Sequence, residues 1–427
     1  PRVDEFNRRK RPYKPPTVVL SSNHEGSRMT KKLEILDSLP GSGKTYAIFN
    51  YMEQDQSRPW LYLSPMKDEI NTRVPEEAQR VNMEFQIPEE GKGTLSLQVL
   101  DYFREGKNVA CTHALTMHFS TEHIQLIRDM KYRVVCDEEL DLIGAFELKA
   151  ADVDFLLHEE MISVDYENFG KVTFNKQEMS YEAKYGQTKL LCDRGCLFMS
   201  KRSTSMLVSY LSPDLILASD RFILLTYNFG GSIMQAFLAL HEINTETLDI
   251  PLYKTTVQVK EQLRELFTFV DSPSIRKIQE EYPLTKSWWT FNTKGAAPNV
   301  VNLKKKISGV IQNSGVNTED IFLTCPVDHF PKLKGGRIRE EHFIAYNKRA
   351  TNQYSNRKLA IHAYNLYMNL AVKSYLQDYG FIINEDSYAL NQAIQWVFRG
   401  CIRKGEPMKV AFLSQRMQSV FKDWLAA

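Results

Sequence analysis

The sequence lacks the long apolar segments that mark membrane and exported proteins. Its 427 residues contain no uncharged apolar run of 18 or more, so we expect no membrane-spanning helix. The first residues also lack the pattern of a signal peptide. Hydrophobic residues make up 43% of the chain and charged residues 25%, which is typical of a globular protein of two or three domains. These features predict a cytoplasmic protein.

Cysteine is scarce, and its spacing does not favour a metal site. Four of the six cysteines lie in apolar, strand-like runs. Cys192 and Cys196 form a C-x3-C pair, but no second pair of Cys or His lies nearby, as a zinc site would require. We therefore expect buried thiols in a reducing compartment.

The chain also has no large excess of one charge, since its net charge is +2. Residues 1–32 carry +6 and the remainder −4, so a polyanion would need a local basic patch. Residues 1–28 have no apolar periodicity, and Met29 has the look of a natural start. We interpret 1–28 as a disordered upstream linker, and a nucleic-acid-binding arm is the alternative.

What the sequence does contain is a phosphate-binding loop. "SLPGSGKT" at residues 38–45 follows the apolar run 33–36 and precedes a helix-like run, as the pattern G-x-x-x-x-G-K-[ST] requires. Ser38 replaces the first Gly. The glycines let backbone N–H groups surround phosphate oxygens, and the helix N-terminus adds partial positive charge. The expected ATP-binding residues are Pro40, Gly41, Ser42, Gly43, Lys44 and Thr45.

A partner for this loop lies at residues 132–143, "YRVVCDEELDLI". An apolar strand there ends in Asp137 and Glu138, the arrangement of a Walker B motif. Lys44 would contact the β- and γ-phosphates, and the Thr45 hydroxyl and Asp137 would hold Mg²⁺. Glu138 would polarise the attacking water as general base. We therefore predict ATP hydrolysis with Mg²⁺.

The second half of the chain repeats an α/β pattern. Strands are expected within 265–271 and 321–330, a helix at 299–315, and a further helix and strand within 387–414. Alternation of strands and helices implies a parallel sheet. We predict an α/β fold of two tandem RecA-like domains, at 29–245 and 246–427. About 90 residues separate Asp137 from Thr226, so we expect an inserted subdomain at about 147–218.

The last of these segments contains Gln395, Arg399 and Arg403 in a Q-x3-R-x3-R pattern. It resembles motif VI, Q-x-x-G-R-x-x-R, of superfamily 2 helicases, although the second Arg falls one position late and Gly follows the first. On one helix the two arginines would share a face. The resemblance implies that Arg399, assisted by Arg403, acts as an arginine finger on the γ-phosphate, with Gln395 also at the catalytic site.

Other segments extend this resemblance to residues 30–415, through short motifs only. Strand ends at 60–74 and 108–119 are similar to those that hold nucleic-acid phosphates in the superfamily, and "FILLTYNFGG" is similar to its motif III. The implied nucleic-acid contacts are Ser64, Pro65, Thr112, His113, Thr351 and Asn352, and Thr226 is the implied coupling residue. Phage- and virus-encoded replication helicases are the most similar group. The chain has no adenine-recognition motif upstream of its loop, which argues against a DEAD-box RNA helicase.

The sequence thus predicts a superfamily 2 motor that moves along single-stranded nucleic acid, DNA favoured over RNA, during replication or recombination. Other replication proteins are candidate partners. Two alternatives remain: an ATP-switched binding protein that does not unwind, and a terminase-type packaging ATPase, which would need a C-terminal nuclease with clustered carboxylates. Trp288 and Trp289 are expected in the core, with base stacking as the alternative.

Overall fold

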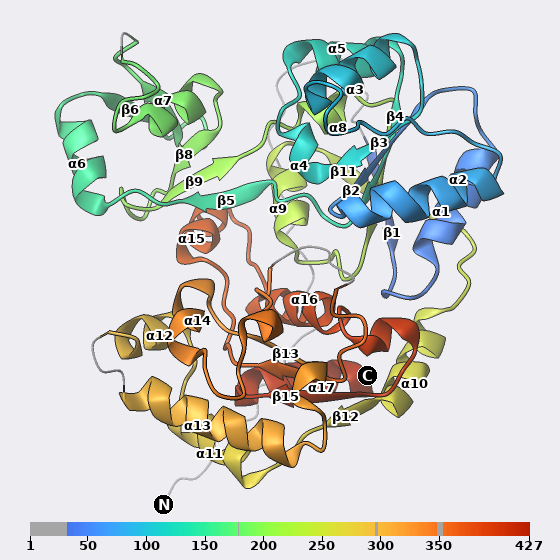
Figure 1. Ribbon diagram of the computed structural model, residues 1–427. Helices are drawn as coiled ribbons and strands as arrows, with labels where there is room; N and C mark the ends of the chain where they lie inside the picture. The colour runs from blue at the N-terminus through green and yellow to red at the C-terminus, as the bar shows by residue number, and fades with distance from the viewer. Residues whose placement is uncertain (1–31, 178, 295–297, 348–352) are drawn as a thin grey trace, which may run out of the picture. The chain divides into compact units, whose positions relative to one another are not determined.

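The computed structural model describes residues 32–177, 179–294, 298–347 and 353–427, which form three β-sheets with surrounding helices (Figure 1). Two sheets are parallel and one is antiparallel. The expected fold class is confirmed: the chain is α/β, with two tandem parallel sheets flanked by helices. Throughout these described ranges, no helix has both the length and the apolar character needed to cross a membrane.

The first parallel sheet has the strand order β11-β1-β10-β4-β2-β3. Its strands are β1 (Lys32–Asp37), β2 (Trp60–Ser64), β3 (Val109–Thr112), β4 (Arg133–Asp137), β10 (Arg221–Thr226) and β11 (Asn244–Thr247). Successive side chains of a strand point to opposite faces, and here both faces are covered. Trp60 and Tyr62 pack on one face, whereas Leu61 and Leu63 pack on the other. This explains the unbroken apolar run of β2.

Each face of this sheet has its own helices. Apolar residues of α1 (Lys44–Glu53) and α2 (Val74–Arg80) share a core with Trp60 and Tyr62. The opposite core takes in α3 (Leu95–Arg104), α5 (Thr121–Asp129), α8 (Asp214–Ala218) and α9 (Ile233–Leu240). The short helix α4 (His113–Thr116) follows β3. A π-helical turn, Glu69–Arg73, joins β2 to α2.

An antiparallel sheet lies in sequence between β4 and β10, which are neighbours in the first sheet. Its order is β5-β9-β8-β7-β6. The strands are β5 (Ile143–Phe146), β6 (Ile162–Asp165), β7 (Lys171–Phe174), β8 (Leu197–Met199) and β9 (Leu207–Tyr210), with helices α6 (Ala150–His158) and α7 (Gly186–Asp193). A separate apolar core, including Val153, Val172 and Phe174, holds this sheet to its helices.

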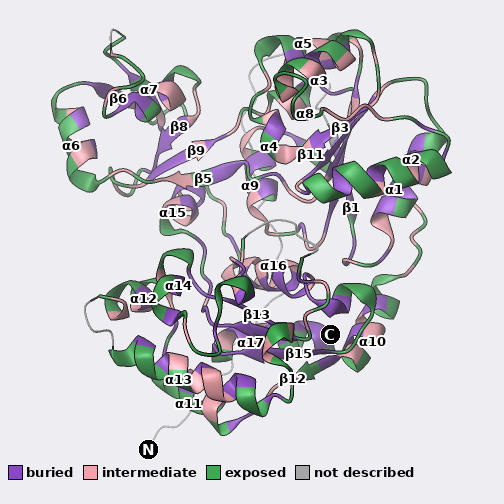
Figure 2. Ribbon diagram, viewed as in Figure 1, coloured by how far each residue is buried: buried purple, intermediate pink, exposed green. Residues whose placement is uncertain are grey.

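The second parallel sheet has the order β12-β15-β14-β13. Its strands are β12 (Phe267–Phe269), β13 (Ile321–Thr324), β14 (Leu359–His362) and β15 (Met408–Phe412). Its helices are α10 (Thr256–Leu266), α11 (Pro273–Glu281), α12 (Lys286–Asn292), α13 (Pro298–Asn313), α14 (Phe330–Leu333), α16 (Glu385–Val397) and α17 (Gln415–Ala426). Helix α15 (Leu370–Asp378) lies in sequence between β14 and α16 but packs against β5 and β9. Figure 2 shows β13 and β15 of this sheet largely buried and the outer faces of α11 and α13 exposed.

The tryptophan pair lies in the core of this second sheet, as the sequence analysis expected. Trp289 is fully buried, and its ring stacks on that of His329. Trp288 is partly buried against Tyr282. A ring enclosed in this way cannot receive a base, so the stacking alternative is wrong for Trp289. No disulfide joins the cysteines within the described ranges, and Cys196 alone among them is not buried.

Candidate active site

The phosphate loop connects β1 to α1 in a conformation that glycine makes possible. Gly41 and Gly43 have φ angles of 87° and 91°, the left-handed region that other residues avoid. The loop is fixed at its start, because the Ser38 amide donates to the Thr226 carbonyl of β10 at 2.9 Å. The Asp37 carboxylate also accepts the amides of Asn228 and Phe229, at 2.7 and 2.9 Å. The loop is therefore anchored to the end of β10.

Several polar groups of this loop suit a phosphate ligand. The hydroxyls of Ser38 and Ser42 are buried and have no hydrogen-bond partner among the described residues. The Lys44 ammonium donates to the Ser38 carbonyl and, at 3.2 Å, to the Leu39 carbonyl. A Cβ on Gly41 would meet no atom within 4 Å, so the backbone there is open to a ligand. Turned N–H groups, a lysine and a helix start are the donor set that phosphate needs.

The Walker B carboxylates lie at the same edge of the sheet as this loop. β10 pairs with both β1 and β4, and parallel strands bring their carboxyl ends together. Asp137 ends β4, and its carboxylate accepts the Tyr62 hydroxyl at 3.2 Å. Glu138 follows with a left-handed backbone, φ 65°, and its amide donates to the Leu225 carbonyl at 2.8 Å.

The electrostatics of this edge favour an added cation. Burial, followed by the negative charges of Glu69 and Glu138, raises the pKa of Asp137 to about 8. Burial also lowers the pKa of Lys44 to about 8, although Asp137, Glu138 and Asp37 oppose the shift. Carboxylates in close proximity repel one another, and a divalent cation would relieve that repulsion.

The residues present fit Mg²⁺ held jointly by protein and nucleotide. The Thr45 side chain is buried at the start of α1, and it lines the same cavity as Asp137. No group of three or more His, Cys, Asp or Glu side chains within the described ranges is arranged to hold a metal ion. Mg²⁺ commonly takes one or two carboxylates and completes its shell with phosphates and water. Thr45 and Asp137 would supply the protein ligands.

The opposite wall of the site comes from the second half of the chain. Gln395 lies on α16, and Arg399 and Arg403 follow that helix. The residue Arg399 is only 7% exposed, and its Nη1 donates to the Ala345 carbonyl at 3.3 Å. The expectation of one helix through both arginines is wrong, because α16 ends at Val397. Arg403 lies in a separate 3-10 turn, Cys401–Lys404, after the extended Gly400.

Both walls belong to one cavity of about 470 Å³. Many of the residues that the sequence analysis predicted for the site line this cavity: Pro40, Gly41, Gly43, Lys44, Thr45, Asp137, Glu138, Thr226, Gln395, Arg399 and Arg403. Ser42 is buried within the loop and is not part of the lining. The structure therefore brings the phosphate loop, the carboxylates and the late arginines to a single site.

The cavity also contains residues that the sequence analysis missed. Glu69 and Arg73, from the π-helical turn, line it beside Asp137. Lys254, just before α10, and Gln262, within α10, also line it, and the Lys254 ammonium donates to the Gln262 side-chain oxygen at 2.8 Å. The "KDEINTR" run has the composition of a solvated helix, so nothing in it marked Glu69 or Arg73.

The residues predicted to contact nucleic acid differ in how far they are buried, and two of them lie outside the described residues. Ser64 is fully buried, and its hydroxyl donates to Glu69 at 2.9 Å, while Pro65 beside it is half-buried. Thr112 and His113 are half-buried at the carboxyl end of β3, outside the cavity, with His113 Nε2 3.5 Å from Cys136 Sγ. Thr351 and Asn352 lie outside the described residues.

Thr226 stands between the loop and the carboxylates. Its carbonyl accepts the Ser38 amide at 2.9 Å, and its hydroxyl donates to the Glu139 carboxylate at 3.2 Å. The side chain is buried. A shift of Thr226 would therefore reach both the phosphate loop and the acidic strand end.

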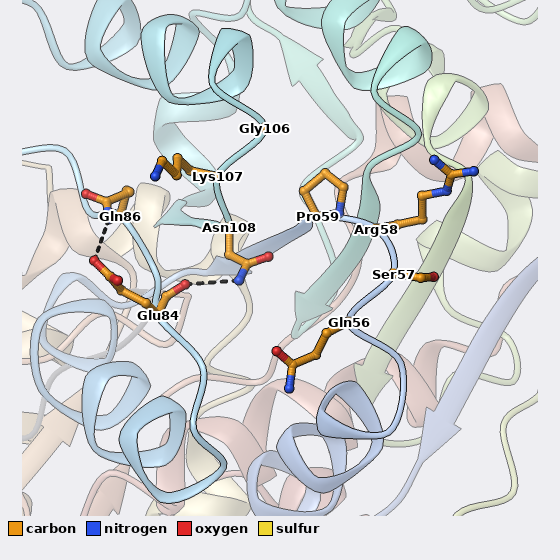
Figure 3. A pocket seen from close by; sticks show the side chains of 9 residues that line it. All are labelled: Gln56, Ser57, Arg58, Pro59, Glu84, Gln86, Gly106, Lys107 and Asn108. Atoms are coloured by element: carbon orange, nitrogen blue, oxygen red, sulfur yellow. Dashed lines mark hydrogen bonds between the residues drawn. The ribbon is translucent and has the colours of Figure 1, made fainter.

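A second hollow lies at the other edge of the first sheet (Figure 3). The loops that lead into β2 and β3 line it. The Asn108 side chain accepts the Trp60 amide at 2.9 Å and donates to the Glu84 carbonyl at 3.0 Å. The Gln86 side-chain amide donates to the Glu84 carboxylate at 2.9 Å. These bonds tie neighbouring loops together, so we assign this hollow a structural role.

Comparison with known proteins gives related sequences. Residues 261–425 match the family model of the YonV C-terminal Rossmann-like domain, and residues 143–208 match that of the YonV middle domain. The chain is 26% identical over 421 residues to the SPbeta prophage-derived uncharacterized protein YonV of Bacillus subtilis (strain 168), covering 92% of this chain and 99% of that protein.

Among solved structures, similar folds include helicases at low identity. Xpd4 of S. tokodaii is 11% identical, with 92% of this chain and 94% of that chain covered and a TM-score of 0.40. S. cerevisiae Dbp5 bound to RNA and ADP BeF3 is 11% identical, with 92% and 82% covered and a TM-score of 0.33. The helicase MrfA is 11% identical with a TM-score of 0.32; 91% of this chain is covered, and it spans about half (48%) of MrfA.

Proposed function

We propose that this chain is an ATP-driven motor that moves along single-stranded nucleic acid, with DNA favoured over RNA. The observation that carries the proposal is the single cavity lined by Lys44 and Asp137 on one side and by Arg399 on the other. ATP held there would contact residues from both halves of the chain. Hydrolysis would then depend on closure of two domains, 29–245 and 246–427, which is how phosphate chemistry is converted into movement.

Each residue has a separate task in this proposal. Lys44 and the turned loop amides bind the phosphates, and Thr45 and Asp137 hold Mg²⁺. Glu138 positions and polarises the attacking water as general base. Arg399, with Arg403, neutralises the charge that develops on the transferring phosphoryl group.

Movement along a strand needs contacts outside the cavity. We place these at the strand ends of the first sheet, where Thr112 and His113 are half-buried, and at Thr351 and Asn352. Thr226 would transmit the state of the cavity to this edge, because its hydroxyl bonds Glu139 while its carbonyl bonds Ser38. Contacts to phosphates position the strand without reading its sequence.

The role in replication or recombination of a phage, in the host cytoplasm, is supported by the prophage origin of the related YonV protein. An ATP-switched binding protein that does not unwind is the second candidate. It would use the same cavity. A strand-displacement assay on tailed duplexes distinguishes the two functions, because only a protein that unwinds displaces the strand.

The direct test is the ATPase rate with single-stranded DNA, duplex DNA and single-stranded RNA at two salt concentrations. We expect stimulation by single strands that weakens as salt rises, because phosphate contacts release counterions. Lys44→Ala should reduce turnover to background with every nucleic acid, since the phosphates lose a charged partner. ATPase activity that persists in Lys44→Ala would reject this cavity as the ATP site.

A further inference from the structure

A short π-helical turn brings two charged residues into the cavity from outside the recognised motifs. The turn spans Glu69–Arg73, directly before α2. π-Helical turns are rare, and many occur at functional sites. Both end residues line the cavity with Lys44 and Asp137. The side chain of Glu69 is 7% exposed, whereas that of Arg73 is 41% exposed.

The Glu69 carboxylate is held at both oxygens. Oε2 accepts the Ser64 hydroxyl at 2.9 Å, and Oε1 lies 3.6 Å from Nη1 of Arg73. The Ser64 hydroxyl in turn accepts the Met66 amide at 3.1 Å. Glu69 is therefore fixed to the end of β2, and Arg73 is tethered to it by a longer and more exposed contact.

Arg73 is within electrostatic reach of the catalytic groups. Its charge acts to lower the pKa of Lys44 and that of Asp137, while Glu69 acts to raise the pKa of Asp137. A triphosphate carries several negative charges and many acceptor oxygens, so it competes well with one carboxylate for a guanidinium. The 3.6 Å contact to Glu69 is long for a hydrogen bond and weak enough to exchange.

We propose that Arg73 binds the phosphates of the nucleotide and that Glu69 is the partner that holds Arg73 at the cavity until the nucleotide enters. Nucleotide entry then transfers Arg73 from Glu69 to phosphate oxygens. The transfer leaves Glu69 with Ser64 as its partner at the end of β2. This inference rests on the proposed function, because it assigns a further cation to the same cavity.

Equilibrium binding of Mg·ATP and of AMP to the full chain tests the inference. Arg73→Gln should weaken Mg·ATP binding by about tenfold to a hundredfold, the effect of losing a charge-assisted hydrogen bond, and leave AMP binding unchanged. Arg73→Lys should recover part of the loss. Glu69→Gln should not weaken Mg·ATP binding. The variant should bind Mg·ATP as tightly as the wild type or more tightly, because Arg73 is released from Glu69.

Arg104→Ala is the matched control, since Arg104 is an exposed arginine paired with Asp101 and Glu122 away from the cavity. It should not change either affinity. If Arg73 only braces Glu69, then Arg73→Gln and Glu69→Gln will weaken binding alike, and the inference is overturned. It is also overturned if Arg73→Gln and Arg73→Lys both keep wild-type affinity. In that case the loss of Mg·ATP binding in Lys44→Ala would leave the proposed function intact. A wild-type chain that does not bind Mg·ATP would reject both.

Discussion

Glu138 has a left-handed backbone directly after Asp137, the last residue of β4. Its φ of 65° is unusual for a residue with a side chain, and its amide is held by the Leu225 carbonyl at 2.8 Å. Such a conformation costs roughly 1 kcal/mol and is retained where the surrounding structure enforces it. Backbone strain of this kind is common at functional sites, which fits a specific role for Glu138.

Replacing Glu138 tests whether this residue is the general base. Glu138→Gln keeps the size of the side chain but removes the proton acceptor. Hydrolysis should fall by about a hundredfold or more, and Mg·ATP affinity should change little, because general-base catalysis contributes about 10² to 10⁴ in rate. Single-turnover hydrolysis and equilibrium binding separate the two effects. A variant that hydrolyses ATP at the wild-type rate would remove Glu138 from the mechanism.

His362 makes the second core sensitive to acid. It lies on β14, fully buried, with its ring against Trp396 and Phe412. Burial lowers its pKa from 6.5 to about 3. Below pH 6.5 the His362 ring binds a proton in the unfolded chain but stays neutral in the folded chain. The free energy of unfolding therefore falls as pH falls from about 6.5 towards 3.

His362→Leu should remove this dependence. Between pH 7 and pH 5 the free energy of unfolding of the variant should fall by about 2 kcal/mol less than that of the wild type. Denaturant titrations at the two pH values measure the difference. The exposed residue His118, replaced in the same way, serves as the control. Equal pH dependence in His362→Leu and wild type would show that this ring is not the source.

Among the elements, α15 belongs by sequence to the second half but packs elsewhere. Val372, Tyr375 and Leu376 of this helix share a core with the first parallel sheet and with β9 of the antiparallel sheet. The Tyr375 hydroxyl donates to the Phe169 carbonyl at 3.0 Å. The segments before and after α15 therefore connect two cores, which is where a hinge between them would act.

One carboxylate at the end of α15 fixes this docking. The Asp378 side chain is 4% exposed and accepts the Ser200 hydroxyl at 2.6 Å, the Lys201 amide at 2.7 Å and Arg202 Nε at 3.1 Å. Asp378→Ala should cost about 3 kcal/mol and raise amide hydrogen exchange at β8 and β9, because three donors lose their acceptor.

The exposed Asp101, which is paired with Arg104, offers the control. Asp101→Ala should cost under about 1 kcal/mol, as exposed ion pairs do. The account of α15 would be wrong if Asp378→Ala changed stability and exchange no more than Asp101→Ala.

Sequence reasoning succeeded where local pattern determines structure. The apolar runs of β1, β4, β10 and β13 predicted strands, and their alternation with helices predicted the two parallel sheets. It failed where tertiary contacts decide. Glu69 and Arg73 belong to a polar run that forms a π-helical turn, where Glu69 accepts a buried hydrogen bond from Ser64. The end of α16 at Val397 separates Arg399 from the helix that precedes it. The roles of the candidate site residues stay predictions.

At the scale of the whole described unit, the two parallel sheets are linked next to the proposed ATP site. Leu39 of the phosphate loop packs in the core of the second sheet. The Asn391 side-chain amide donates to the Asn228 backbone carbonyl at 3.1 Å, and the Trp424 indole donates to the Tyr227 hydroxyl at 2.5 Å. Asn228 and Tyr227 directly follow β10, which also anchors the loop. A change at the phosphates would thus reach the second sheet within a few contacts.

The most direct test of this account is the nucleic-acid-stimulated ATPase rate of Arg399→Ala at saturating ATP. We predict a fall of about a thousandfold or more with ATP affinity largely retained, as for arginine fingers. Arg399→Lys and thermal unfolding control for loss of the buried side chain, and the exposed Arg339→Ala should behave as the wild type. Stimulated turnover in Arg399→Ala at the wild-type rate would contradict an ATP site completed by both halves of the chain.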